Sequence, residues 1–219
     1  KIKKIGNLKF IDSEDKNSNF LKPELIKELK NKKIWVASST HKSEEIFCAK
    51  AHLYLKHYYK NLMTIIIPRH VHRVNEIIYD IKNLNLKYQL HSSRMKSLKN
   101  IDIYIVDTFG ETKKFHKIGS SVFLGGSIID RGGQNPLEAA RFGAKILHGP
   151  NIDNFIDIYK LLKIFKISKK IISPKQLASS IVFKKNKIIG IKIKKIGEKI
   201  LKNTLKELDY LIKNEFKKT

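Results

Sequence analysis

Glycines, an asparagine and a carboxylate follow a short apolar run in the segment VFLGGSIIDRGGQNPLEAARFGAKILHGP at 122–150. A glycine-rich loop after a strand lets bare backbone approach a ligand closely. The helix expected after this loop has Asn135 as its N-cap and Pro136 as its first residue, where the missing proline N–H costs nothing. Free backbone N–H groups and the positive end of the helix dipole would face one point. The segment therefore predicts an anion site, and phosphate is the expected ligand.

An arginine follows the apolar run at 63–67, in the sequence Pro68-Arg69. A guanidinium at the end of a strand can hold a phosphate or a carboxylate through two parallel hydrogen bonds. The alternative is a surface arginine that pairs with a neighbouring acid. Both interpretations fit the sequence.

Two carboxylates, Glu111 and Glu138, come shortly after two further apolar runs. Each lies three residues after a capping residue, Thr108 or Asn135, so each fits a capping box in which the glutamate bonds the cap backbone. The alternative role is a carboxylate that accepts hydrogen bonds from ribose hydroxyls. Gly110, next to the first of them, would let the backbone come close to a ligand.

The sequence SSTH at 38–41 follows another apolar run and precedes a helical pattern with Glu44 and Glu45 in its first turn. Serine and threonine are preferred helix caps, so an ordinary N-cap explains them. Contact with a ligand explains them equally well.

These loops need a sheet whose strands end side by side. Near-continuous apolar runs alternate with helical patterns, which is typical of a parallel sheet covered on both faces. Strands are expected at 34–37, 63–67, 88–90, 101–106, 121–124 and 145–148. Helices are expected at 23–30, 43–59, 71–83, 112–117 and 136–142. The chain is thus predicted to form an α/β fold with a doubly wound parallel sheet, in which ligands bind at the carboxyl ends of the strands.

The pattern divides the chain into three parts. Residues 1–20 are expected to be a linker or a first strand, and 21–173 the Rossmann-like domain. Residues 174–219 are expected to be a helical tail, with helical spacing at 174–183, 187–202 and 204–216. An apolar stripe in the tail could pack on this domain or reach another; it comprises Leu201, Leu205, Leu208, Leu211 and Ile212.

The chain is strongly basic. Its 219 residues include 45 Lys and Arg against 20 Asp and Glu, a formal net charge of +25. Such a balance is common in nucleic-acid-binding proteins. Here, however, the lysines are dispersed along every segment, and no basic motif is interleaved with aromatic residues. A basic surface of this kind favours anionic lipid head groups or a phosphorylated substrate.

Several other chemistries are disfavoured. The single cysteine, Cys48, cannot form a disulfide within the chain and fits a reducing compartment. No P-loop, no GxGxxG after the first strand and no GxSxG motif is present. The histidines lack clustered acidic or cysteine partners, so neither a metal nor another cofactor is expected. There is no signal peptide or membrane-spanning run, and because the chain begins with Lys1 we expect a piece of a longer protein.

Taken in order, these motifs resemble the C-terminal half of the bacterial 3-deoxy-D-manno-octulosonic acid (Kdo) transferases, glycosyltransferases with a GT-B fold. The resemblance covers most of the chain. It rests on GNLKF at 6–10, ASSTH at 37–41, IPRH at 67–70, DTFGE at 107–111, GGSIIDRGGQNPLEAA at 125–140 and HGP at 148–150. One departure is Gln134, which stands where the family usually has histidine; an amide can donate a hydrogen bond but carries no charge.

The resemblance implies a Rossmann-like donor domain that binds CMP-Kdo. The positions that it assigns to this substrate are Pro68, Arg69, Phe109, Gly110, Glu111, Asn135, Pro136, Leu137 and Glu138. Secondary candidates in the same loops are Ser39, Thr40, His41, Ser127, Gly132, Gly133 and Gln134. The family's general base is a glutamate of the N-terminal domain, so no catalytic residue is expected here, and this chain alone is expected to bind donor without turnover.

The resemblance also implies partners and a location. The acceptor would be a lipid A precursor (lipid IVA) in lipopolysaccharide biosynthesis, and the protein would be peripheral on the cytoplasmic side of the cell inner membrane. Two alternatives stay open: a GT-B domain for another nucleotide sugar such as a UDP-hexose, and a non-catalytic basic nucleic-acid-binding protein. If the chain is the donor domain of a Kdo transferase, no nucleic-acid partner is expected.

Overall fold

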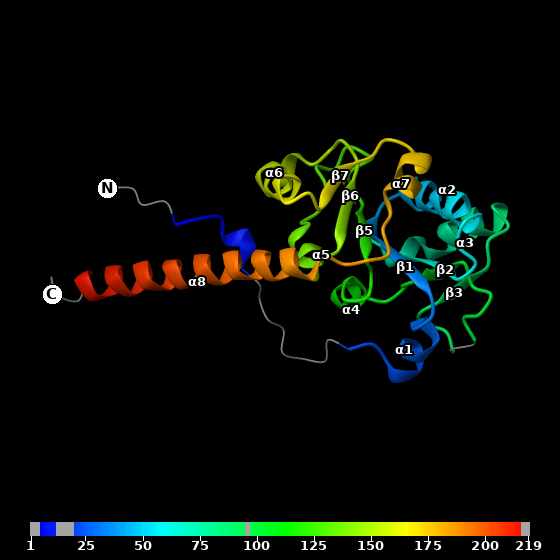
Figure 1. Ribbon diagram of the computed structural model, residues 1–219, viewed down its shortest axis with the longest axis horizontal. Helices are drawn as coiled ribbons and strands as arrows, with labels where there is room; N and C mark the ends of the chain where they lie inside the picture. Colours follow the sequence, from blue (N-terminus) through cyan, green and yellow to red (C-terminus); the bar gives the residue numbers. More distant parts are fainter. Residues whose placement is uncertain (1–4, 12–19, 95–96, 216–219) are drawn as a thin grey trace.

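The structure is a computed structural model that describes residues 5–11, 20–94 and 97–215. Seven parallel strands form one sheet in the order β3-β4-β2-β1-β5-β6-β7 (Figure 1). The strands are β1 (Lys33–Thr40), β2 (Leu62–Pro68), β3 (Tyr88–Leu90), β4 (Ile103–Ile105), β5 (Ser121–Leu124), β6 (Lys145–His148) and β7 (Ser168–Lys170). The predicted α/β class with a doubly wound parallel sheet is confirmed.

The strand order places the topological switch point of the sheet beside β1. From β1 the chain first builds β2, β3 and β4 on one side, then crosses over to build β5, β6 and β7 on the other. Connections therefore leave the carboxyl ends of β1 and β5 in opposite directions, which opens the sheet edge between them. The loops after β1 and β5 meet at this switch point.

Helices cover both faces of the sheet. Alternate residues of β1 point to opposite sides, so Val36 packs in one core cluster and Trp35 and Ala37 in the other. The face of Val36 is covered by α1 (Pro23–Leu29), α4 (Thr112–His116), α5 (Leu137–Arg141), α6 (Ile156–Ile164) and the first part of α8 (Lys187–Glu215). The opposite face is covered by α2 (Glu44–Lys56), α3 (Val74–Asn83) and α7 (Pro174–Ser180). Short 3-10 helices are η1 (Leu8–Phe10), η2 (Val71–Arg73) and η3 (Asp153–Phe155).

Two departures from the expected elements concern the ends of the chain. Leu8–Phe10 forms a 3-10 helix where a strand or linker was expected, and residues 1–4 and 12–19 lie outside the described part. The tail patterns at 187–202 and 204–216 form one continuous helix, α8, because no residue between them breaks it.

One strand, β7, was not predicted. Its sequence, Ser-Lys-Lys, is polar, and the strand lies at the sheet edge.

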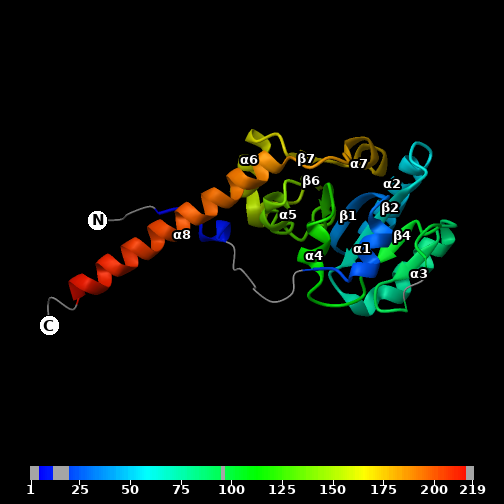
Figure 2. The ribbon, with the colours of Figure 1, turned by 60° about the horizontal axis from the view of Figure 1, so that its bottom comes forward.

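α8 begins against the domain and then extends away from it (Figures 1 and 2). A Cβ on Gly190 would lie 2.7 Å from the Arg141 carbonyl oxygen, and one on Gly197 would lie 2.2 Å from that of Phe10. The two glycines therefore let α8 lie directly on the end of α5 and on η1. Beyond them the predicted apolar stripe is exposed; its members are Leu201, Leu205, Leu208, Leu211 and Ile212.

Candidate functional site

The end of β1 touches the glycine-rich loop that follows β5. The backbone N–H of Gly125 donates to the Ser38 carbonyl oxygen at 2.9 Å. A Cβ on Gly125 would lie 2.2 Å from the Ser39 carbonyl oxygen. Only a glycine fits this approach, so the first glycine of the loop serves contact between two parts of the protein.

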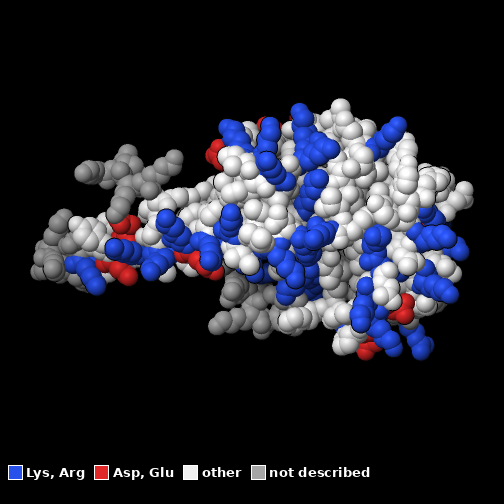
Figure 3. Space-filling model, in the orientation of Figure 1, with Lys and Arg blue, Asp and Glu red and all other residues white. Residues whose placement is uncertain are grey.

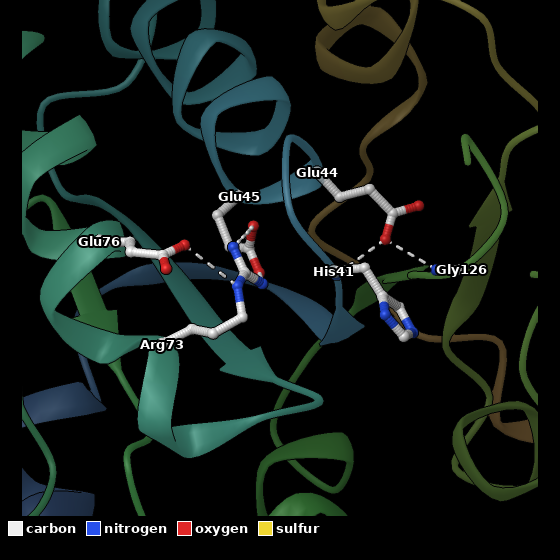
Figure 4. A network of polar contacts seen from close by, with 6 residues as sticks. All are labelled: His41, Glu44, Glu45, Arg73, Glu76 and Gly126. Carbon is white, nitrogen blue, oxygen red and sulfur yellow. Dashed lines mark hydrogen bonds and ion pairs between the residues drawn. The ribbon is translucent and has the colours of Figure 1, made fainter.

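Glu44, in the first turn of α2, binds the backbone of the glycine-rich loop (Figure 4). Its Oε2 accepts from the N–H groups of His41 at 3.0 Å and Gly126 at 2.7 Å. Its Oε1 accepts from Ser127 at 3.1 Å and Ile128 at 3.0 Å. An internal carboxylate thus occupies the amides at 126–128, so a phosphate in the glycine-rich loop would have to bind without these three N–H groups.

Three secondary candidates in the loop make contacts within the protein. The Ser127 hydroxyl donates to the Leu124 carbonyl oxygen and accepts from the Gly149 N–H, so it ties the end of β5 to the end of β6. The N–H of Gly133 donates to the Gly126 carbonyl oxygen. Gly132 is buried, and a Cβ there would lie 2.4 Å from the Asn154 side chain. These contacts shape the loop.

His41 and Gln134 meet above Gly126. A Cβ on Gly126 would lie 3.4 Å from His41 Nε2 and 3.5 Å from Gln134 Nε2. The His41 ring also packs edge-on against His70, with centroids 5.6 Å apart. Burial lowers the pKa of His41; Glu44 opposes the shift, and His70, Arg131 and Arg69 add to it. The neutral ring and the amide together offer polar groups without charge at this edge.

The two arginines after β2 have different surroundings. Arg73 is paired: it donates to both oxygens of the buried Glu45, at 2.9 and 3.3 Å, and to Glu76 at 3.3 Å (Figure 4). Arg69 is exposed, and no hydrogen bond or ion pair of its guanidinium is found among the described residues. Its backbone N–H donates to the Thr40 carbonyl oxygen, which fixes it beside the end of β1. The ion-pair interpretation therefore holds for Arg73, and Arg69 is available to a ligand.

The loop after β4 presents an exposed ring. Phe109 is 79% exposed, and Gly110, with φ of +80°, has nothing within 4 Å of a built Cβ. Glu111 lies at the start of α4 and pairs with Lys114 at 3.0 Å and with His91 at 3.7 Å. Among the described residues no hydrogen bond joins its carboxylate to the Thr108 N–H, so the capping-box alternative is not supported for this residue.

The start of α5 is capped largely as expected. Asn135 Oδ1 accepts from the Leu137 N–H at 3.0 Å, and the helix proper begins one residue after Pro136. The Leu137 side chain is fully buried in the core. Of these three residues, only Asn135 is exposed.

Glu138 does not close a capping box. Its Oε1 lies 2.7 Å from Nδ1 of the buried His116, and His116 Nε2 lies 3.0 Å from Ser38 Oγ. Burial raises the pKa of Glu138, but the hydrogen bond and charge of His116, with Lys113 and Arg141, outweigh it and hold this pKa below its usual value. The carboxylate is therefore ionised at neutral pH and held from one side.

Sequence reasoning did not find His116 as part of the site; it considered Ser38 only within the SSTH loop and placed Glu44 only in a helix turn. His116 comes from the short α4 and Ser38 from the buried end of β1, 78 residues earlier. No motif spacing joins them, because the contact depends on strand order. Among the described residues there is no group of three or more His, Cys, Asp or Glu placed to hold a metal ion.

Comparison with known proteins gives Kdo transferases and a bifunctional glycosyltransferase among the relatives. The 3-deoxy-D-manno-octulosonic acid transferase of Rickettsia prowazekii is 32% identical over 198 residues, 90% of this chain and 43% of the relative. That of Haemophilus influenzae is 29% identical over 170 residues, 74% of this chain and 38% of the relative. A bifunctional glycosyltransferase/methyltransferase of Fusobacterium nucleatum is 30% identical and shares 94% of this chain and 34% of its own. No family model matches.

A solved structure shares the fold. It is the crystal structure of the C-terminal CMP-Kdo binding domain of WaaA from Acinetobacter baumannii, with a TM-score of 0.67 and 23% identity. The match covers 84% of this chain and 94% of that domain. The chain spans between 34% and 43% of the length of these curated relatives.

The fold and the relatives define the class first: this chain is a parallel α/β domain that is similar to part of several glycosyltransferases. More particularly, it is a relative of the Kdo transferases and has the fold of the C-terminal domain of one of them. The resemblance expected from the motifs is thereby confirmed.

Proposed function

We propose that this chain is the donor-binding domain of a Kdo transferase and binds CMP-Kdo at the carboxyl edge beside β1. One observation carries the proposal: Arg69 and Glu138 both attach to the end of β1, through Thr40 and through His116 with Ser38. A guanidinium for which the described residues supply no partner and an ionised carboxylate thus flank the switch point of the sheet. This suits a ligand that combines a phosphate with ribose hydroxyls.

Each predicted residue takes a role from its surroundings. Arg69 binds the phosphate through two hydrogen bonds. Glu138 accepts hydrogen bonds from the ribose. Phe109 offers an exposed face to the cytosine base, and Gly110 and Asn135 bring backbone and amide groups beside it. Pro68 and Leu137 are buried, so they shape the site from beneath.

The reaction would be loss of CMP from the anomeric carbon of Kdo through an oxocarbenium-like state. Negative charge grows on the leaving phosphate, and a prepositioned guanidinium at Arg69 stabilises it. The attacking hydroxyl needs a general base on the opposite face of the sugar. We infer that this base belongs to another domain, so this chain alone binds donor without turnover.

We further propose that the acceptor is a lipid A precursor and that the protein acts at the cytoplasmic face of the inner membrane. Lys and Arg side chains spread over one face of the domain with few acidic groups between them, and along α8 they are interleaved with acidic side chains (Figure 3). Anionic head groups attract such a surface. Among the described residues no helix is long and apolar enough to cross a bilayer.

Calorimetric titration with CMP tests the donor site. The wild-type chain is expected to bind CMP and to bind UMP much more weakly. Arg69→Ala is expected to weaken CMP at least tenfold, whereas Lys175→Ala, on the exposed surface of α7, leaves it unchanged. No heat with CMP in the wild type would overturn the proposal.

Binding measurements on the same protein distinguish the alternative functions. A site for a UDP-hexose predicts that UMP binds at least as tightly as CMP. A nucleic-acid-binding protein predicts oligonucleotide binding that falls steeply with salt and does not depend on Arg69.

A further inference from the structure

His116 lies where three segments of the site meet. It belongs to α4, directly after the loop that carries Phe109, and its ring reaches Ser38 of β1 and Glu138 of α5. The side chain is 4% exposed, so a ligand does not reach it. Its role must therefore act through the groups that it touches.

The hydrogen bond to Glu138 has a defined direction. An ionised carboxylate only accepts, so the proton on Nδ1 of His116 donates to Glu138 Oε1 at 2.7 Å. Nε2 lies 3.0 Å from the Ser38 hydroxyl, which can either donate to this nitrogen or accept from it. The ring cannot turn without losing both bonds. No hydrogen bond of Glu138 Oε2 is found in the part of the chain that the structure describes.

We propose that His116 is a positioning residue for donor recognition: it holds one oxygen of Glu138 so that the other stays free for the ribose hydroxyls. This inference rests on the proposed CMP site. It adds a residue that never touches the nucleotide and that none of the motifs includes. Positioning matters because a carboxylate held in one rotamer loses little conformational freedom when the ligand binds.

The same ring also links three elements of the site, α4, α5 and β1. α4 carries the loop with Phe109, α5 carries Glu138, and β1 carries Ser38, so one imidazole fixes the ribose ligand relative to the base side of the site. The backbone of α4 is held separately, since Lys185 Nζ donates to the His116 carbonyl oxygen at 3.3 Å. The imidazole can thus be replaced while this contact to the helix backbone remains.

Two polar substitutions separate the two ring nitrogens. In His116→Asn the amide nitrogen can take the place of Nδ1 and still donate to Glu138. In His116→Gln the amide reaches toward Ser38 in the place of Nε2. CMP is titrated against both variants and Glu138→Gln, together with 2′,3′-dideoxy-CMP, which lacks both hydroxyls. His57→Asn, at the exposed end of α2, is the control.

We expect His116→Asn to bind CMP within about threefold of wild type and His116→Gln to bind it about tenfold more weakly. Affinity for dideoxy-CMP is expected to be the same in all variants. The double variant with His116→Gln and Glu138→Gln should bind CMP no more weakly than His116→Gln alone. If both His116 variants bind CMP as wild type does, the positioning role is overturned while the donor site stands. Equal losses for CMP and dideoxy-CMP would overturn it too. A wild type that binds no CMP overturns the proposed function itself.

Discussion

The carboxylate of Glu44 accepts a hydrogen bond from the backbone N–H of Gly126, 82 residues further along the chain, at 2.7 Å. Acids in the first turn of a helix are usually explained by the helix dipole. This one is fully buried and binds four backbone N–H groups from two loops. It therefore holds the glycine-rich loop against the end of β1.

Replacing Glu44 by glutamine should destabilise the protein by about 2 kcal/mol, because hydrogen bonds to a charged group are lost and an amide NH2 faces backbone donors. Urea unfolding measures the change. Glu24→Gln, an exposed first-turn acid of α1, is the matched control and should cost less than about 0.5 kcal/mol. Equal effects of both substitutions would contradict the assigned role of Glu44.

The arginines at 69 and 73 should respond in opposite ways. Arg73→Met leaves the carboxylate of Glu45, with 2% of its side chain exposed, without its partner and should cost about 3–5 kcal/mol of unfolding free energy. Arg69→Met should change stability by less than about 0.5 kcal/mol but abolish most CMP affinity. Unfolding and titration of both variants check this; loss of stability at position 69 would contradict it.

Stability should fall between pH 7 and pH 5. His52 and His148 are buried, and burial lowers the pKa of both, although hydrogen bonds to Asp102 and to the Gly149 carbonyl oppose the shift. Below the ordinary histidine value of about 6.5 the unfolded chain takes up protons that the folded chain does not. Each residue can therefore remove at most about 1.4 kcal/mol per pH unit.

Urea unfolding from pH 5 to 7.5 measures that slope. The free energy of unfolding of His148→Leu should depend less steeply on pH than that of wild type in this range. The carboxyl of Asp102 does not interfere, because its pKa lies below its usual value and its contribution is lost only under about pH 4. The same slope in both proteins would contradict the assignment.

Alanine at Gly125 should disrupt the site through the backbone. Its Cβ would lie 2.2 Å from the Ser39 carbonyl oxygen, so β1 and the loop after β5 must separate. We expect a loss of more than about 2 kcal/mol of stability and weaker CMP binding. Gly110→Ala is the comparison: it meets nothing within 4 Å and carries only the strain of a positive φ, about 1 kcal/mol. Equal effects would contradict the close-approach argument.

Much of the fold could be predicted because each buried strand is a short apolar run bounded by polar loops. The strands at 88–90, 121–124 and 145–148 have the predicted bounds. β7 could not be found, because a three-residue edge strand of Ser and Lys buries too little to leave a pattern. The continuity of α8 was also missed, since the helical pattern weakens near residue 203 without a proline or glycine to end it.

The sequence predicts only some of the residues of the candidate site, because the others are brought together by tertiary contacts. Arg69 and Glu138 could be selected because strand ends meet at one edge of a parallel sheet. Local capping rules failed for Glu111 and Glu138, because the carboxylate of Glu111 pairs with Lys114 one turn on and that of Glu138 with His116 from another helix. The choice of Glu44 as the anion of the glycine-rich loop depends on contacts that only the folded chain creates.

α8 is one unbroken helix of 29 residues, about 43 Å long at about 1.5 Å per residue. Near its start Gly190 presses on the end of α5, the same short helix that carries Glu138. The start of α8 and Glu138 are therefore joined through one short helix. Any change that moves the start of α8 must be accommodated by α5, the helix that carries this carboxylate.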